Sequence, residues 1–200
     1  MHHPWHDIPI DRAPEEVPVY IECVPQDTVK YELDKTTGFL KVDRPHKFSS
    51  LPPHLYGFVP RTYSGENVAR IWKEETGKDV KGDGDPLDIF VLCSCVITHG
   101  VIVNAIPIGG LRMLDQGEAD DKIVAIMKSD PVYGKISTLE ELPEVCERLE
   151  HYLVTYKGVK SKVSIDGTYG PDEARKVIEA SMVDYCEFKC PRPTCTFLEL

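Results

Sequence analysis

The hydrophobic positions of the first 130 residues fall in short runs that alternate with polar residues or are rich in β-branched side chains. Strands with one buried face have this pattern. We expect strands at Val17–Cys23, Val29–Leu33, Phe39–Val42, Asp88–Ser94, Val101–Ile108, Leu111–Leu114 and Ile123–Met127, with turns at residues 34–38 and at Gly109-Gly110. Many short strands separated by turns predict a meander that closes toward a barrel.

Three segments have helical spacing instead. Residues 66–76 place Val68, Ile71 and Trp72 on one face before a terminating glycine, which predicts a peripheral helix inserted between strands. A second helix is expected to begin at Thr138, which has capping-box spacing to Glu141, and to end near residue 156. The last helix is expected to run from about residue 171 to 185, because proline suits a first helical position. The fold class is therefore α+β.

The length of 200 residues fits a single domain. Within this 1–200 domain we expect an N-terminal tail at residues 1–16, a helix-containing insert at 61–81 and an irregular C-terminal tail at 190–200. The small group of histidines at positions 2, 3 and 6 belongs to the N-terminal tail.

The formal net charge of −10 disfavours nucleic acid and anionic membranes as partners, because the long-range field repels them. The longest apolar stretch, Ile89–Ile97, is too short to span a bilayer, and no signal peptide is evident. We expect a cytoplasmic protein.

The seven cysteines are irregularly spaced, so they are expected to be reduced thiols. Cys93 and Cys95 are expected on one face of a strand. The late group lacks the spacing of a zinc site and comprises Cys186, Cys190 and Cys195.

Two acidic segments carry the main candidate chemistry. Asp83, Asp85 and Asp88 lie within six residues, in a turn before a buried strand. A second group follows at Asp115, Glu118, Asp120 and Asp121. Crowded carboxylates raise one another's pKa or share cations, and Mg²⁺ is the common oxygen-seeking ion, so we expect the two loops to form one metal site. The spacing excludes an EF-hand loop, and no P-loop is present.

Several basic and aromatic residues have two interpretations. Lys30 and Glu32 share one strand face, which is a solvated surface or part of a site. The guanidinium of Arg44 matches phosphate geometry. Tyr56 lies on a proline-rich edge or loop, where it either donates a hydrogen bond to an anion or packs as an ordinary aromatic side chain. Lys157 at a helix end is explained by the helix dipole or by substrate binding.

Taken together and in order, these segments resemble soluble family I inorganic pyrophosphatase. The resemblance runs from about residue 21 to 158, and it rests on Ile21-Glu22, Lys30-Tyr31-Glu32, Val42-Asp43-Arg44, Tyr56-Gly57, Asp83-Gly84-Asp85-Pro86-Leu87-Asp88, Asp115 with Asp120 and Lys122, and Tyr156-Lys157. The element at residues 83–88 is close to a signature of that family. The resemblance implies a closed, oligonucleotide-binding-like β-barrel of mostly antiparallel strands with flanking helices. It also implies Mg²⁺-dependent hydrolysis of pyrophosphate to two orthophosphates by a metal-activated water.

The same resemblance implies a role for each matching residue. Asp83, Asp88 and Asp120 would hold the tightest of several Mg²⁺ ions, Asp88 also a second, Asp115 with Asp120 a third, and Glu32 one that arrives with substrate. Mn²⁺ or Zn²⁺ would be substitutes. Asp85 would orient or deprotonate the nucleophile, and Glu22 would be a supporting acid. The phosphoryl groups would be held by Lys30, Arg44, Tyr56, Lys122, Tyr156 and Lys157.

Two departures from the short bacterial pattern affect these expectations. Pro52 stands where many members carry tyrosine. Residues 61–81 form a longer stretch than in the short bacterial enzymes, so the way the subunits pack does not follow from the resemblance. We expect a homo-oligomer, with dimer, trimer and hexamer as alternatives.

Two other functions remain in competition: a non-catalytic cation-binding or oligonucleotide-binding barrel, and a hydrolase of longer polyphosphates or nucleotides. The mixture of acids with Lys and Arg argues against the first, because a pure cation site needs no basic residues.

Overall fold

The computed structural model describes residues 2–47, 49–158 and 162–189, so the predicted C-terminal tail and Cys190 and Cys195 lie outside the described residues. The helices are α1 (Pro4–Asp7), α2 (Glu66–Thr76), α3 (Pro143–Thr155) and α4 (Pro171–Lys189), with a 3₁₀ turn at Leu139–Glu141. The strands are β1 (Val17–Cys23), β2 (Val29–Leu33), β3 (Leu40–Pro45), β4 (Leu55–Phe58), β5 (Lys81–Gly82), β6 (Asp88–Leu92), β7 (Ile102–Asp115), β8 (Glu118–Ala119), β9 (Lys122–Met127) and β10 (Val163–Tyr169). None of the helices in the described part is long and apolar enough to cross a membrane.

Five strands form a ring of hydrogen-bonded neighbours. The order runs β1-β4-β6-β9-β7, and β7 pairs again with β1. Within this ring only β6 and β9 are parallel, whereas the other pairs are antiparallel. The ring aligns Asp88 at the start of β6 with Lys122 at the start of β9.

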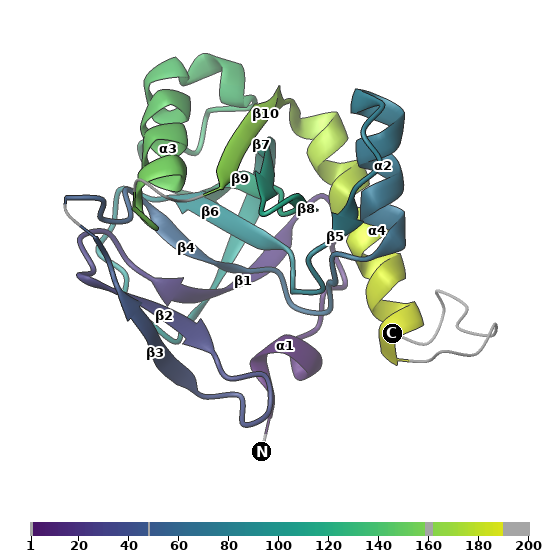
Figure 1. Ribbon diagram of the computed structural model, residues 1–200. Helices are drawn as coiled ribbons and strands as arrows, with labels where there is room; N and C mark the ends of the chain where they lie inside the picture. Colours follow the sequence, from purple (N-terminus) through teal and green to yellow (C-terminus); the bar gives the residue numbers. More distant parts are fainter. Residues whose placement is uncertain (1, 48, 159–161, 190–200) are drawn as a thin grey trace.

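The helices cover two different sides of the strands. In Figure 1, α2 and α4 lie side by side, α3 lies on the opposite side, and the β2-β3 hairpin extends below the ring. The first turn of α2 has no side-chain cap of its own, since Gly65 occupies the N-cap position. Its free backbone donors are satisfied by Asp184 of α4, which accepts from Gly65 N at 2.9 Å and Val68 N at 3.1 Å. The helix predicted at residues 66–76 is confirmed, and it is anchored to α4.

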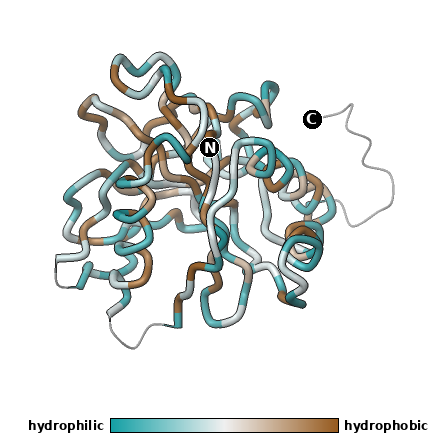
Figure 2. The backbone as a smooth tube through the Cα atoms, turned by 90° about the horizontal axis from the view of Figure 1, so that it is seen from above, coloured by the Kyte–Doolittle hydropathy of each residue, from teal (hydrophilic) through white to brown (hydrophobic). Residues whose placement is uncertain are grey.

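The hydrophobic run of β6 is buried on both faces. Ile89 and Val91 pack in a cluster that includes residues of α4, whereas Phe90 and Leu92 pack in a second cluster that includes residues of α3. In Figure 2 the hydrophobic segments concentrate in the middle of the molecule and many outer loops are hydrophilic. A central strand with two buried faces must be apolar at every position, which is why no alternation is visible there.

The structure corrects the interpretation of residues 52–60. The prolines there predicted an edge or a loop, yet Leu55–Phe58 form β4, which pairs with β1 on one side and β6 on the other. No ladder hydrogen bond is lost, because the prolines at 52, 53 and 60 lie outside the strand. The neighbouring strand also approaches very closely at Gly57, where a Cβ would lie 1.9 Å from the carbonyl oxygen of Tyr20.

The two strands expected on either side of Gly109-Gly110 are one strand, β7, with a bulge between Pro107 and Gly109. The glycines do not form a turn. They allow Tyr169 of β10 to pack against the backbone, since a Cβ on Gly110 would lie 2.4 Å from the tyrosine ring. Strand β10 was not predicted at all, because most of its residues are exposed or half-buried and give no hydrophobic pattern.

Element ends differ from the predictions in several places. β3 extends to residue 45, three residues beyond the prediction. The capping box of Thr138 and Glu141 exists, but it caps the 3₁₀ turn, and α3 begins at Pro143. β6 ends at Leu92, so Cys93 and Cys95 lie after the strand and not on it.

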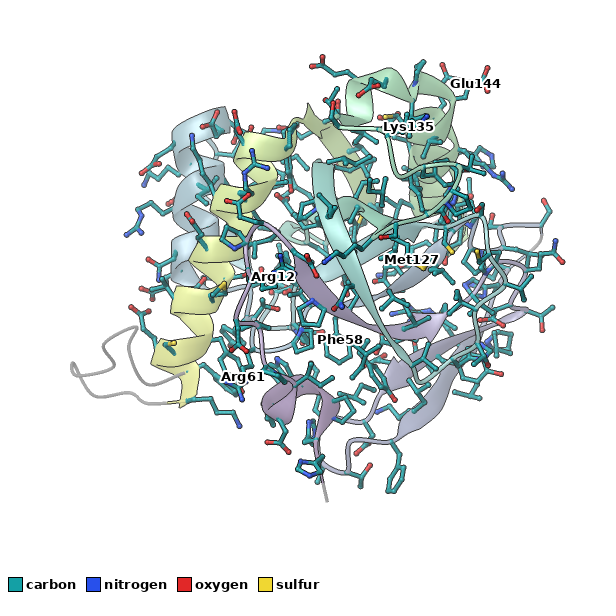
Figure 3. The ribbon with its side chains drawn as sticks, turned by 180° about the vertical axis from the view of Figure 1, so that it is seen from behind. Arg12, Phe58, Arg61, Met127, Lys135 and Glu144 are labelled. Carbon is teal, nitrogen blue, oxygen red and sulfur yellow. The ribbon has the colours of Figure 1, made fainter. Side chains whose placement is uncertain are left out.

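The N-terminal tail is packed against the domain. Trp5 in α1 is buried and donates its indole N–H to the carbonyl oxygen of Thr62 at 2.8 Å. The ring of His6 is hydrogen-bonded to the Tyr185 hydroxyl of α4 at 2.8 Å. Arg61 donates to the carbonyl oxygen of His6, and Figure 3 shows it close to α1.

Acid sensitivity of the fold is expected from His54, next to β4. Burial, followed by the nearby charge of Arg148, lowers the pKa of His54 from 6.5 to about 4. The folded state therefore binds this proton less readily than the unfolded chain, so the stabilisation is complete above pH 6.5 and is lost as the pH falls to 4. Wild type should therefore lose about 2 kcal/mol of unfolding free energy between pH 7 and pH 5 because of His54. The His54→Gln variant should not show this part of the loss. Urea titrations at the two pH values measure this, with the exposed His151→Gln variant as control, and equal pH dependence in all three proteins would contradict it.

Candidate active site

The first acidic loop connects β5 to β6. The backbone of Ser64 holds this loop through two hydrogen bonds. The N–H of Gly84 donates to the carbonyl oxygen of Ser64, and the N–H of Ser64 donates to the carbonyl oxygen of Asp85. Within the loop the Asp85 N–H donates to Asp83 Oδ1 at 3.0 Å. Gly84 has a φ of 75°, a conformation that glycine adopts without strain. This backbone arrangement sets the positions of Asp83 and Asp85 before β6 begins at Asp88.

The second acidic segment runs from the end of β7 through β8 to the start of β9. The N–H of Asp120 donates to the carbonyl oxygen of Met113, which fixes the segment on β7. Lys122 pairs across the sheet with Asp88 on one side and Leu111 on the other. The strand register therefore places the second segment beside the first loop.

Both acidic segments open onto one cavity of about 260 Å³. Its lining comprises Lys30, Glu32, Asp43, Arg44, Tyr56, Asp83, Asp85, Asp88, Asp115, Gln116, Glu118, Asp120, Lys122, Tyr156 and Lys157. Twelve of the thirteen candidate residues chosen from the sequence are in this set. The thirteenth, Glu22, lines a smaller adjoining cavity together with Lys30, Glu32 and Asp85.

The cavity has a strong excess of negative charge. Eight of its lining residues are acidic and four are basic. Burial, with repulsion from Asp120, raises the pKa of Asp83 to about 8. Burial also raises the pKa of Asp120. Carboxylates that repel one another in this way are relieved by bound cations, and oxygen donors at this density suit Mg²⁺.

Lys122 lies at the base of the cavity with 2% of its side chain exposed. It forms ion pairs with Asp88 and Asp120. Burial alone would lower its pKa, but the adjacent carboxylates hold the pKa of Lys122 well above its ordinary value. The Tyr56 hydroxyl donates to Asp88 Oδ2 at 2.5 Å, and burial raises the pKa of Tyr56. Both remain protonated donors at neutral pH.

A second group of basic side chains comes from the β2-β3 hairpin. Lys30 and Arg44 are paired across it, and the two-residue alternation of the strand places Lys30 and Glu32 on the cavity side. Arg44 Nη1 lies 3.1 Å from Asp43 Oδ2. Arg44 Nε is buried and, in the described part of the chain, has no hydrogen-bond partner. A buried guanidinium donor left open beside a polar cavity suits an anionic ligand.

The end of α3 supplies the remaining candidates. Lys157 forms an ion pair with Asp115, and its ammonium group lies 5.5 Å from the centre of the Tyr156 ring. Arg44 lies 5.8 Å from the same ring on the hairpin side. Tyr156 is therefore close to two cationic side chains, and all three residues line the cavity.

The structure adds residues to which the sequence assigned no role at the site, although Asp43 and Glu118 belong to segments already named. Lys35, in the β2-β3 turn, forms an ion pair with Asp85 and lines the smaller adjoining cavity. Asp43, Gln116 and Glu118 also line the cavity. Lys35 lies in the turn that follows Lys30 and Glu32, and this position is the one feature of the sequence that pointed to it. A lysine in a turn has no distinctive pattern of its own, so the position alone did not predict a functional role.

The second acidic segment is supported from α2. Trp72 is fully buried and donates its indole N–H to Asp121 Oδ1 at 2.7 Å, and Tyr169 donates to Asp121 Oδ2 at 3.0 Å. Asp121 lies between Asp120 and Lys122 in the sequence. Helix α2 is therefore part of the support of the cavity, although its sequence pattern predicted only a peripheral element.

Replacing Trp72 by phenylalanine is expected to destabilise the protein by about 2–4 kcal/mol, because a buried carboxylate loses a donor and the core loses volume. It should also weaken activity, since Asp121 adjoins two cavity residues. Urea unfolding and steady-state kinetics measure the two effects. The exposed Glu74→Gln variant on the same helix should be within about 0.5 kcal/mol of wild type, and an equal change in both variants would exclude a role for the indole.

Comparisons with known proteins agree with this geometry. The sequence profile of the family described as inorganic pyrophosphatase matches residues 19–186. The chain is 47% identical to an inorganic pyrophosphatase of Chlamydia caviae, over 96% of this chain and 94% of that protein. It is 38% identical to soluble inorganic pyrophosphatase 2 of Chlamydomonas reinhardtii, over 95% and 92% of the two chains. The crystal structure of inorganic pyrophosphatase from Thermus thermophilus superposes with a TM-score of 0.78 at 28% identity, covering 92% of this chain and 99% of that one.

Proposed function

The chain belongs to the inorganic pyrophosphatase family, and we propose that the cavity between its two acidic segments is where it hydrolyses pyrophosphate to two orthophosphates with Mg²⁺ as cofactor. The observation that carries this proposal is the charge of the cavity. Eight acidic and four basic residues line it, so it repels a highly charged anion, and cations that enter with the anion relieve this repulsion. The basic side chains give the same cavity groups that bind the anion directly.

The donor set fits Mg²⁺, because the acidic ligands are all oxygen donors. We assign Asp83, Asp88 and Asp120 to the tightest ion, Asp88 also to a second, Asp115 with Asp120 to a third, and Glu32 to an ion that enters with substrate. The raised pKa of Asp83 supports this, since a cation would remove the repulsion that contributes to it. Mn²⁺ and Zn²⁺ are proposed as substitutes.

When bound, Mg²⁺ lowers the pKa of a coordinated water and neutralises the phosphoryl oxygens. Asp85 is proposed to orient that water and take its proton, because it lines the cavity with 47% of its side chain exposed, whereas Asp88 of the same segment is 23% exposed and paired with Lys122. The cationic groups of Lys30, Arg44, Lys122 and Lys157, with the hydroxyls of Tyr56 and Tyr156, are proposed to hold the two phosphoryl groups. Charge that develops on the leaving phosphate is stabilised by these fixed donors. Glu22, beside Lys30 and Glu32, is proposed as a supporting acid.

The proposed cofactor is tested by removing it. Phosphate release from pyrophosphate should fall to background when chelator removes divalent ions, and excess Mg²⁺ should restore it. ATP and tripolyphosphate should be assayed in parallel, and we expect both to be turned over much more slowly than pyrophosphate. Full activity in the absence of any divalent cation would contradict the metal assignment, and equal turnover of ATP would favour the broader polyphosphate hydrolase.

Three further statements about the whole protein are proposals. The ring of five strands is proposed to be a closed barrel of the oligonucleotide-binding type, supported by the return pairing of β7 with β1. A homo-oligomer is proposed, because self-association would bury some of the exposed large apolar side chains, among them Val96, Ile102 and Val132. A sedimentation-equilibrium mass of one chain would contradict it.

A cytoplasmic location, with no nucleic-acid or membrane partner, is proposed from the net charge of −10 and the reduced thiols.

A further inference from the structure

A group of sulfur atoms lies at the far end of the two parallel strands that begin in the active site. Strand β6 runs from Asp88 to Leu92 and is followed by Cys93, and β9 runs from Lys122 to Met127. Their register pairs Leu92 with Ile126, so the residues after β6 lie beside the end of β9. Met127 is labelled in Figure 3, which shows the side of the molecule opposite to that of Figure 1.

The distances within this group suit a metal ion. Cys93 Sγ lies 3.6 Å from Met127 Sδ. Ligand atoms of Cys93, Cys95 and Asp130 all lie within 4.8 Å of one another. Metal–sulfur bonds of about 2.3 Å bring sulfur ligands to similar separations, so Cys93 already lies at suitable distances from each of the other two sulfur residues. Cys95 is exposed, which gives an ion from solution direct access.

The loop that carries the thiols is held in place before any ion binds. Asp130 Oδ2 accepts from the N–H and the hydroxyl of Ser94, at 2.7 and 3.0 Å. Asp130 Oδ1 accepts from the N–H groups of Val132 and Tyr133, both at 2.9 Å. Although burial alone would raise the pKa of Asp130, these donors lower it to about 2.

Asp130 is therefore a charge beside the sulfurs and not an open ligand, because each carboxylate oxygen already accepts two hydrogen bonds. Three sulfur atoms remain as donors: two thiols and one thioether. This set selects a soft ion, since thiolate and thioether ligands favour Cu⁺, whereas Mg²⁺ prefers oxygen. The Cys93 thiol donates to the carbonyl oxygen of Cys95 at 3.4 Å and accepts from its N–H at 3.2 Å, so an ion that replaces the thiol proton also replaces the first of these bonds.

We propose that Cys93, Cys95 and Met127 form a binding site for Cu⁺ that is separate from the catalytic cavity. Binding forms two bonds to thiolate sulfur and one to thioether sulfur, and it releases the thiol protons to solvent without any change of oxidation state. Burial raises the pKa of Cys93 to about 11, so its proton is present at neutral pH and must be displaced by the ion.

The two sites lie at opposite ends of the same strand pair. Cys93 follows Asp88 by five residue steps along β6, which is about 16 Å in an extended strand. One end presents carboxylates and the other presents sulfur, so hard and soft cations are sorted by ligand chemistry. The irregular cysteine spacing of the sequence gave no indication of this site, because its third ligand is 34 residues away from Cys93.

The test uses the full chain, reduced and anaerobic, with excess Mg²⁺ present to occupy the carboxylates. Wild type should retain one more equivalent of Cu⁺ than the Cys93→Ser/Cys95→Ser variant in competition with a Cu⁺ chelator. Copper X-ray absorption should report sulfur neighbours in that equivalent. Met127→Leu, which conserves volume, should weaken it by at least about tenfold. The half-buried Cys146→Ser is the matched thiol control and should bind Cu⁺ as wild type does.

Pyrophosphatase activity in Mg²⁺ shows that each variant is folded, since neither cysteine lines the catalytic cavity. Equal Cu⁺ binding by wild type and the double-serine variant would overturn the proposal. Preferential retention of Zn²⁺ over Cu⁺ that depends on Asp130 and not on Met127 would overturn the identity of the ion. These outcomes do not depend on the assignment of Mg²⁺ ligands in the active site.

Discussion

Replacing Asp85 by asparagine is expected to lower kcat for pyrophosphate by about 10²–10⁴-fold, the range that a positioned proton acceptor contributes. Asparagine has nearly the same shape but does not accept a proton at neutral pH. Asp85 lines the cavity, where its ion-pair partner among the described residues is Lys35 and not Lys122. The affinity for Mg²⁺ should therefore change by no more than a few fold.

Steady-state kinetics across a Mg²⁺ titration separates the two quantities for this variant. Calorimetric titration of Mg²⁺ without substrate gives the affinity independently of turnover. Asp79→Asn is a control, because Asp79 is an exposed acid in the preceding connection, between α2 and β5, and it pairs with Lys73 outside the cavity. A loss of activity in Asp85→Asn that excess Mg²⁺ fully restores would show that Asp85 is a metal ligand and not the proton acceptor.

Replacing Asp88 by asparagine is expected to damage metal binding and rate together. We expect Mg²⁺ affinity to fall by about 10- to 100-fold, with a lower kcat even at saturating Mg²⁺. Asp88 accepts from Tyr56 and pairs with Lys122, so its charge also sets the positions of two proposed substrate ligands. Its loss changes the metal site and the phosphoryl site at once.

The comparison of these two variants is informative because both remove one carboxylate from the same loop. Metal titration, kcat at saturating Mg²⁺ and thermal unfolding with and without Mg²⁺ should be measured for each. Asp88→Asn should lose much of the stabilisation that Mg²⁺ gives wild type, whereas Asp85→Asn should keep it. Wild-type Mg²⁺ affinity in Asp88→Asn would remove this residue from the metal site.

Local patterns were sufficient for the elements whose determinants lie close together in the chain. The runs at β1 and β2, the helical face of α2 and the proline at the start of α4 are all short-range signals, and the structure has these elements at those positions. The acidic turn before β6 was also evident, since three carboxylates within six residues are unusual ahead of a buried strand. These features depend on spacing, which a sequence contains in full.

Other features depended on partners that are distant in the chain. β4 lies between two strands even though prolines flank it, and Gly109-Gly110 serves the approach of Tyr169, which is about 60 residues away. Strand β10 has little apolar character and exists because β7 offers it hydrogen-bonding partners. No local pattern contains this information.

The sequence by itself therefore determined the chemistry available to this protein: which carboxylates, lysines and tyrosines are present, and the local turns and strands that carry them. The tertiary structure decided what these groups do together. The register of β6 with β9 places Lys122 against Asp88, Trp72 reaches Asp121 across 49 residues, and Cys93 meets Met127 at the other end of the same strands. Contacts of this kind form only when strand pairing and burial bring distant side chains together, because their energies depend on distance in space and not on separation along the chain.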